Sequence, residues 1–165
     1  MVSSSKVAVT GGAGFIGSHL CEALAEHGHD VTILDNLSSG TMDNLQEALK
    51  LPSVKLVVGD CKNPTDIRDA VSKADVVYHF AANPELRLEL ADPVTCFREN
   101  LYATHILLEA IKQADVNTIV FASTSTVYGD AKIIPTPENY SPLEPISIYG
   151  ASKLASEALI TSYCH

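Results

Sequence analysis

The chain has 165 residues, 46% of them hydrophobic, and a formal net charge of -9. That length and composition suffice for one domain with a buried core. The acidic charge argues against nucleic acid as a partner, because no basic patch would meet its phosphates. We see no signal peptide, no membrane-spanning run and no metal-binding spacing among the four cysteines, and we expect a cytoplasmic protein with reduced thiols.

Short β-branched runs alternate with helical patterns along the chain. Continuous apolar runs of this kind are typical of strands that are buried on both faces of a parallel sheet. The sequence predicts strands at 6–10, 30–35, 54–59, 76–80 and 118–123. It predicts helices at 15–27, 42–50, 63–71, 93–114 and from about 147 onwards, with a long loop at 134–145. We therefore expect an α/β fold, a Rossmann-type doubly wound parallel sheet with strand order 3-2-1-4-5.

A glycine-rich turn lies between the first predicted strand and the first predicted helix, in the run VTGGAGFIG. Glycine at position 11 permits the tight turn, at 14 lets the backbone approach a pyrophosphate, and at 17 lets the helix pack on the strand. Free N–H groups at the helix start favour a phosphate. We assign cofactor contacts to Gly11, Gly14, Phe15, Ile16 and Gly17. A purely structural turn is the alternative.

Two aspartates lie at the ends of the second and third predicted strands. Asp35 ends the second strand, where its carboxylate can accept both hydroxyls of an adenosine ribose and would repel a 2′-phosphate. No Arg or Lys follows at 36–40, so NAD is favoured over NADP; the alternative is an ordinary turn aspartate. Asp60 ends the third strand and could accept from the adenine amino group, although a capping or turn role is equally open.

Tyr149 and Lys153 are four residues apart and therefore share one face of the last predicted helix. A nearby ammonium would lower the pKa of the phenol and make it a general base near neutral pH. The segment at 121–129 leaves the fifth strand at its carboxyl end, where ligands bind in such sheets. A hydroxyl there could contact the substrate oxygen that the tyrosine deprotonates. The alternative is a solvated helix face.

These motifs together resemble the extended short-chain dehydrogenase/reductase family, and within it the NAD-dependent nucleotide-sugar epimerases. The matching residues are Gly11, Gly14, Gly17, Asp35, Asp60, His79-Phe80-Ala81-Ala82, Asn100, Thr124, Tyr149 and Lys153. The resemblance implies epimerisation at C4 of a UDP-hexose such as UDP-glucose or UDP-galactose, through a 4-keto intermediate. It implies that Tyr149 is the acid/base, that Lys153 lowers its pKa and holds the nicotinamide ribose, and that Thr124 hydrogen-bonds the sugar hydroxyl.

The resemblance also implies the remaining cofactor contacts and a homodimer. Those contacts are Asn36, Asp60, Cys61 through its backbone, Ala81 and Ala82 beneath the cofactor, and Asn100. Asn100 is interpreted as organising the site, with helix packing as the equal alternative. His79 lies inside an apolar strand and is interpreted as a core histidine.

The absence of carboxylates at the two positions after Thr124 indicates which subfamily the chain resembles. Related sugar 4,6-dehydratases carry an Asp-Glu pair directly after the threonine, and related decarboxylases carry a Glu two residues after it. Here Ser125 and Thr126 occupy these positions and cannot act as acids or bases near pH 7. The pattern therefore fits 4-epimerisation, which needs only the tyrosine.

The last predicted helix stops at Cys164-His165 without a glycine cap, and members of the family are substantially longer. We expect residues 1–165 to be a Rossmann NAD(P)-binding domain, truncated before the sixth strand and without the small C-terminal substrate domain. The alternatives are a non-catalytic NAD-binding module, a truncated gene product without turnover of its own, and a short reductase with the same Tyr-Lys pair.

Overall fold

The computed structural model describes residues 4–83 and 92–165 of the chain. These residues form two compact units. The first unit comprises Met1–Ala82 and Ile106–Ala122, and the second comprises Asn83–His105 and Ser123–His165.

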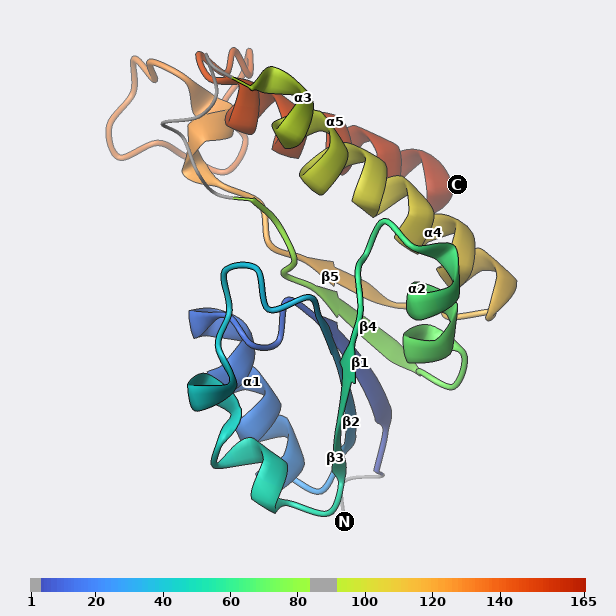
Figure 1. Cartoon of the computed structure of the whole chain (residues 1–165). Coiled ribbons are helices and arrows are strands. Elements are labelled where there is room, and N and C mark those ends of the chain that lie inside the picture. Colours follow the sequence, from blue (N-terminus) through green and yellow to red (C-terminus); the bar gives the residue numbers. More distant parts are fainter. Residues whose placement is uncertain (1–3, 84–91) are drawn as a thin grey trace. The chain divides into compact units, whose positions relative to one another are not determined.

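The first unit contains a five-stranded sheet (Figure 1). Its strands are β1 (Lys6–Thr10), β2 (Asp30–Asp35), β3 (Val54–Val58), β4 (Val76–His79) and β5 (Ile119–Phe121). The order is β3-β2-β1-β4-β5 and every neighbouring pair is parallel, which confirms the predicted sheet. Strands β3, β4 and β5 are one to three residues shorter than predicted. The order reverses between β1 and β4, and ligands bind at such a switch point, at the carboxyl ends of the strands.

Helices cover both faces of this sheet. Helix α1 (Phe15–Glu26) lies on one face and α2 (Pro64–Val71) on the other (Figure 1). The core beneath α1 is formed by side chains from β1, β2 and the helix: Val7, Val9, Val31, Ile33, Cys21 and Ala25. Helix α2 begins at Pro64, one residue after the predicted start, because Asn63 caps it: the Asn63 side chain accepts a hydrogen bond from the Thr65 N–H at 2.9 Å.

The prediction of an α-helix at 42–50 is wrong. Two short 3₁₀ turns, η1 (Met42–Leu45) and η2 (Ala48–Lys50), occupy this stretch. A segment this short is a marginal α-helix, so tertiary contacts decide its shape. Leu45 is fully buried, and the Asn44 side chain donates to the Ala13 carbonyl at 2.8 Å. These two anchors hold the stretch against the glycine turn.

The second unit is helical. One continuous helix comprises α3 (Pro93–Cys96), the π-helical segment η4 (Phe97–Tyr102) and α4 (Ala103–Gln113), whose later residues belong to the first unit. The sequence predicts this helix but not its π-helical turn. Asp92 caps the helix, and its side chain accepts from the Thr95 N–H at 3.3 Å. The 3₁₀ turn η5 (Ser125–Tyr128) and helix α5 (Ile148–Tyr163) complete the unit. Residues 134–145 form a loop, as predicted.

Within residues 4–83 and 92–165, no helix combines the length and apolar character that crossing a membrane requires. The same ranges hold no group of three His, Cys, Asp or Glu side chains suited to a metal ion. The four cysteines, all inside the described part of the chain, form no disulfide.

Candidate functional site

The glycine turn has the geometry that a dinucleotide phosphate requires. Gly11 adopts a φ of +71°, and a Cβ there would lie 2.5 Å from the Ala81 backbone nitrogen. A Cβ on Gly17 would collide with the Gly11 carbonyl oxygen. A Cβ on Gly14 would have only the Gly11 carbonyl oxygen nearby, at 3.3 Å, so a ligand can approach the backbone there. The turn therefore needs glycine for its own shape at 11 and 17, and leaves space at 14.

The start of α1 is open to an anion. Gly14 caps the helix without any side-chain hydrogen bond, and the first turn carries no acidic residue. The side chains of Phe15 and Ile16 are 78% and 65% exposed. Unsatisfied N–H groups and the positive end of the helix dipole favour a phosphate at such a terminus. The residues present thus fit a bound pyrophosphate.

Asp35 is buried at the end of β2, and both of its carboxylate oxygens accept backbone hydrogen bonds. Oδ2 accepts from the Ala13 N–H at 2.9 Å, and Oδ1 accepts from the Leu37 N–H at 2.8 Å. The carboxylate thereby ties the glycine turn to the loop after β2. Each oxygen has a second lone pair, so the group can still accept ribose hydroxyls.

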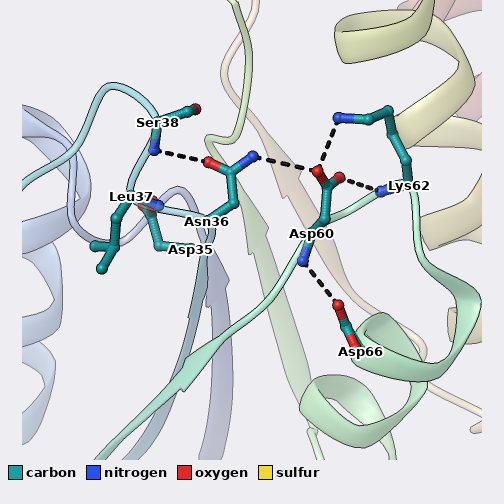
Figure 2. A network of polar contacts seen from close by, with 7 residues as sticks. All are labelled: Asp35, Asn36, Leu37, Ser38, Asp60, Lys62 and Asp66. Atoms are coloured by element: carbon teal, nitrogen blue, oxygen red, sulfur yellow. Dashed lines mark hydrogen bonds and ion pairs between the residues drawn. The ribbon is translucent and has the colours of Figure 1, made fainter.

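A polar network surrounds Asp60, which follows β3 (Figure 2). Its Oδ1 accepts from the Lys62 N–H at 2.8 Å, and its Oδ2 accepts from the Lys62 ammonium at 2.9 Å and from the Asn36 amide at 3.3 Å. Partial burial would raise the pKa of Asp60. The hydrogen bonds from Lys62 and Asn36 and the Lys62 charge together outweigh burial and hold that pKa below its ordinary value. Asp60 is therefore an ionised acceptor at neutral pH.

Buried side chains support the segment at the end of β4. The Ala81 N–H donates to the Thr10 hydroxyl at 3.3 Å, and this hydroxyl lies 2.7 Å from His79 Nδ1. The His79 ring is 1% exposed and stacks on Phe121. His79 is therefore the core histidine that the sequence predicts, and it supports the backbone at Ala81.

Cys61 lies beside Asp60 and is buried. Burial raises the pKa of its thiol to about 12, and the Asp60 charge acts in the same direction. The side chain is therefore a neutral thiol, which leaves the backbone as the part of Cys61 available to a ligand. The backbone contact that the resemblance implies for Cys61 stays a prediction.

The Tyr-Lys pair belongs to α5 in the second unit. Ser147 caps this helix, and its hydroxyl accepts from the Gly150 N–H at 2.9 Å. Tyr149 and Lys153 are four residues apart within the helix and share one face, as predicted. The Lys153 side chain is 2% exposed. Burial lowers the pKa of Lys153 to about 8, and the Glu157 charge opposes this effect.

One expectation about this pair is wrong. Burial raises the pKa of Tyr149, and the opposing contribution is a hydrogen bond with the Thr124 side chain rather than the Lys153 charge. The physical reason is that the phenol is half-buried and that the buried ammonium is itself destabilised. The hydrogen bond with Thr124 therefore favours the phenolate, in opposition to burial.

Thr124 also caps the turn that follows β5. Its hydroxyl accepts from the Thr126 N–H at 3.3 Å and lies 3.1 Å from the Thr126 hydroxyl. Ser125 and Thr126 form the first turn of η5 directly after it. The side chains that follow Thr124 are thus hydroxyls, held within one short turn.

Asn100 lies in the π-helical segment η4 and is 2% exposed. Its Oδ1 accepts from the Asn83 N–H at 2.8 Å, while its Nδ2 donates to the Asn83 carbonyl at 3.3 Å and to the Ser152 hydroxyl at 3.0 Å. Both amide hydrogens are therefore used within the protein. These bonds tie η4 to Asn83 and to α5, so the organising role of Asn100 stays a prediction beside helix packing. π-Helical turns of this kind are frequent at functional sites.

Three residues that were not predicted from the sequence lie beside predicted site residues or next to them in the chain. Ser152 donates to the Tyr149 carbonyl at 2.7 Å, Glu157 accepts from the Ser123 hydroxyl, and Lys62 holds Asp60. Helical spacing could have indicated two of them, because Ser152 is three residues after Tyr149 and Glu157 is four after Lys153. Lys62 is two residues after Asp60, and nothing in that spacing indicates an ion pair.

The sheet order and the glycine turn define a dinucleotide-binding Rossmann domain. The model of the NAD dependent epimerase/dehydratase family matches residues 7–165, and the chain belongs to this family. The family's description names NAD, the cofactor that the sequence predicts from Asp35.

Curated relatives of this chain include UDP-glucose 4-epimerases. A UDP-glucose 4-epimerase of Corynebacterium glutamicum is 37% identical over 158 residues, which is 96% of this chain and 46% of that protein. A putative UDP-glucose 4-epimerase of Methanocaldococcus jannaschii is 38% identical over 95% of this chain and 50% of its own length. The chain thus spans about half the length of the curated relatives it matches.

Solved structures of 4-epimerases are also similar to this chain. The crystal structure of a UDP-galactose 4-epimerase is 51% identical, with a TM-score of 0.85 over 96% of this chain and 51% of that chain. The UDP-glucose 4-epimerase from Brucella ovis in complex with NAD is 31% identical, with a TM-score of 0.88 over 97% of this chain and 48% of its own.

Proposed function

We propose that this chain binds NAD and supplies the dinucleotide-binding half of a nucleotide-sugar 4-epimerase that interconverts UDP-glucose and UDP-galactose. The observation that carries the proposal is the arrangement on α5. Tyr149 and the buried Lys153 share one face of this helix, and Thr124 hydrogen-bonds the phenol. The substrate assignment is supported by the similarity to a UDP-glucose 4-epimerase and to a UDP-galactose 4-epimerase.

Residues of the first unit would hold the adenosine and pyrophosphate of NAD. The open backbone at Gly14 and the start of α1 would bind the pyrophosphate. Asp35 would accept the ribose hydroxyls and Asp60 the adenine amino group, and Asn36, Cys61, Ala81 and Ala82 would complete the contacts. When bound, NAD supplies the acceptor and donor of the hydride at C4 of the sugar.

The chain's own chemistry is proton transfer at Tyr149. In its phenolate form, which the hydrogen bond with Thr124 favours, its oxygen would take the O4 proton while the C4 hydride leaves. It would return the proton when hydride adds to the other face of the 4-keto sugar. Thr124 would hydrogen-bond O4 and hold it beside the phenol. Lys153 would hold the nicotinamide ribose, and Asn100 would organise these groups through Ser152. Positioning of this kind contributes much of the rate in such reactions.

The hydroxyls at Ser125 and Thr126 favour epimerisation over dehydration or decarboxylation. Removing a C5 proton and expelling a C6 hydroxyl requires a carboxylic acid and a base close to the sugar. A serine or threonine hydroxyl does not ionise near pH 7. Hydride exchange at one carbon needs the tyrosine alone, which this chain supplies.

A homodimer is the proposed assembly. The second unit carries a groove between η4, the start of α4 and α5, lined by Phe97, Leu101, Tyr102, His105, Ala155, Ala158, Leu159 and Ser162. Phe97 and Tyr102 are 53% and 40% exposed. Large apolar side chains gathered on one face are typical of a protein–protein interface. A second copy of the chain would cover this face, and Phe97→Glu would then give monomers in sedimentation equilibrium.

The experiment that tests the proposed function uses a chain of the relatives' length that contains these residues. Incubated with NAD and UDP-galactose, it should form UDP-glucose, and Tyr149→Phe should abolish this conversion while NAD remains bound. Retained conversion by Tyr149→Phe would overturn the assignment of the acid/base.

A further inference from the structure

We propose that Lys62 is a positioning residue of the adenine subsite, which fixes the Asp60 carboxylate so that the site selects adenine over bases without a 6-amino group. The inference rests on the proposed binding of NAD and goes beyond it, because it concerns a residue that touches no part of the cofactor in the proposal. It depends on the polar network in Figure 2.

Lys62 holds both oxygens of the Asp60 carboxylate. Its backbone N–H donates to Oδ1 at 2.8 Å and its ammonium donates to Oδ2 at 2.9 Å. Two donors from one residue, one on each oxygen, fix the plane of the carboxylate as well as its position. The ion pair is partly screened, since the side chains are 27% and 36% exposed. Its main effect is therefore on geometry rather than on the stability of the fold.

The backbone of Asp60 is held from the other side. Its N–H donates to Oδ2 of Asp66, in the first turn of α2, at 2.9 Å. A Cβ on Gly59 would lie 2.8 Å from that same Asp66 oxygen, so the glycine allows this close approach. Both ends of the Asp60 residue are thus fixed before any ligand binds.

Asn36 connects this carboxylate to the loop after β2. Its amide donates to Asp60 Oδ2 at 3.3 Å, and its Oδ1 accepts from the Ser38 N–H at 3.0 Å (Figure 2). Asp35, the proposed ribose acceptor, immediately precedes Asn36 in the chain. The network therefore sets the distance between the groups proposed for ribose and for adenine.

The chemistry of an ionised carboxylate gives the selectivity. It has four lone-pair positions and no donor; Lys62 and Asn36 use three of them, and one is left for a ligand. The exocyclic amino group of adenine donates and can use that position. Hypoxanthine presents a carbonyl oxygen at the same place, which an anionic acceptor repels. A site built around one hydrogen bond rejects an analogue that lacks it, provided that the acceptor is fixed.

The test compares NAD with nicotinamide hypoxanthine dinucleotide, which differs from it at this position of the base. Calorimetric titration of the 165-residue chain should give at least about a tenfold preference for NAD. Lys62→Met removes the ammonium and should reduce that preference to about twofold, and Lys62→Arg should restore it. Lys55→Met, which removes an exposed lysine from β3, serves as the matched charge control and should leave the preference unchanged.

The outcomes separate this inference from the proposed function. A wild-type chain that binds neither dinucleotide would refute the proposed NAD binding itself. A wild-type chain that binds NAD, but without preference over the hypoxanthine analogue, would overturn the inference alone. So would an unchanged preference in Lys62→Met. Circular dichroism checks that the variant folds, and Lys62→Gln replaces it in the same comparison if it does not.

Discussion

Replacing Lys153 by methionine should stabilise the fold, although the residue is proposed to serve the reaction. Lys153 is 2% exposed, and methionine has a similar length without the charge. A buried ammonium carries a desolvation cost that an apolar side chain avoids. Functional sites often retain groups that lower the stability of the fold because the activity requires them.

The pKa of Lys153 gives the magnitude. It falls from an ordinary 10.5 to about 8, and at about 1.36 kcal/mol per pKa unit this difference corresponds to about 3 kcal/mol. Below pH 8 both the folded and the unfolded chain carry the ammonium, and the folded state bears the full cost. Between pH 8 and 10.5 the folded chain has lost a proton that the unfolded chain still binds, so the free energy of unfolding rises with pH.

Denaturant unfolding of the wild type and of Lys153→Met checks this expectation. At pH 7 the free energy of unfolding of the variant should be higher by up to about 3 kcal/mol. This gain is reduced by the favourable charge interaction with Lys153 that Glu157 loses. The difference should shrink as the pH is raised from 8 to 10.5. The exposed Lys55→Met should change the free energy of unfolding by about 0.5 kcal/mol or less at every pH. A less stable Lys153→Met at pH 7, or a difference independent of pH, would refute the reasoning.

Three further outcomes are expected. Calorimetry should show NAD bound ahead of NADP by about 2–3 kcal/mol, because Asp35 would face the 2′-phosphate; equal affinities would contradict that role. In a chain of the relatives' length, Tyr149→Phe should lower turnover by about 10²–10⁴-fold or more with NAD still bound, and Thr124→Ala should cost less; initial rates with UDP-galactose measure both. Chromatography should find no 4-keto-6-deoxy sugar from UDP- or dTDP-glucose, since Ser125 and Thr126 supply no carboxylate, and its appearance in quantity would indicate a dehydratase.

The sheet could be predicted from the sequence because its signals are local. Each strand is a short β-branched run, and the glycine turn can be placed from steric needs that the structure bears out at Gly11 and Gly17. Helix caps at Asn63, Asp92 and Ser147 are equally local, since each side chain bonds a backbone N–H two or three residues on. Features of this kind depend on few distant contacts.

What the sequence analysis missed depends on contacts that are distant in the chain. The stretch 42–50 takes its shape from the burial of Leu45 and from the bond between Asn44 and Ala13, which lie 31 residues apart. The raised pKa of Tyr149 follows from burial, which spacing on a helix does not report. The Asn36–Asp60 bond links residues 24 apart, and it becomes visible only when β2 and β3 lie side by side.

The most direct test of the central proposal follows the hydrogen at C4. UDP-galactose deuterated at C4 is incubated with NAD and either the 165-residue chain or a chain of the relatives' length that contains it. The longer chain should form UDP-glucose with the deuterium retained at C4, because the same hydride leaves and returns. The 165-residue chain should bind NAD with negligible conversion, because confining the hexose for hydride transfer would require walls from the rest of the relatives' length. Loss of the label from UDP-glucose, or a longer chain that binds NAD and leaves UDP-galactose unchanged, would contradict the proposed function.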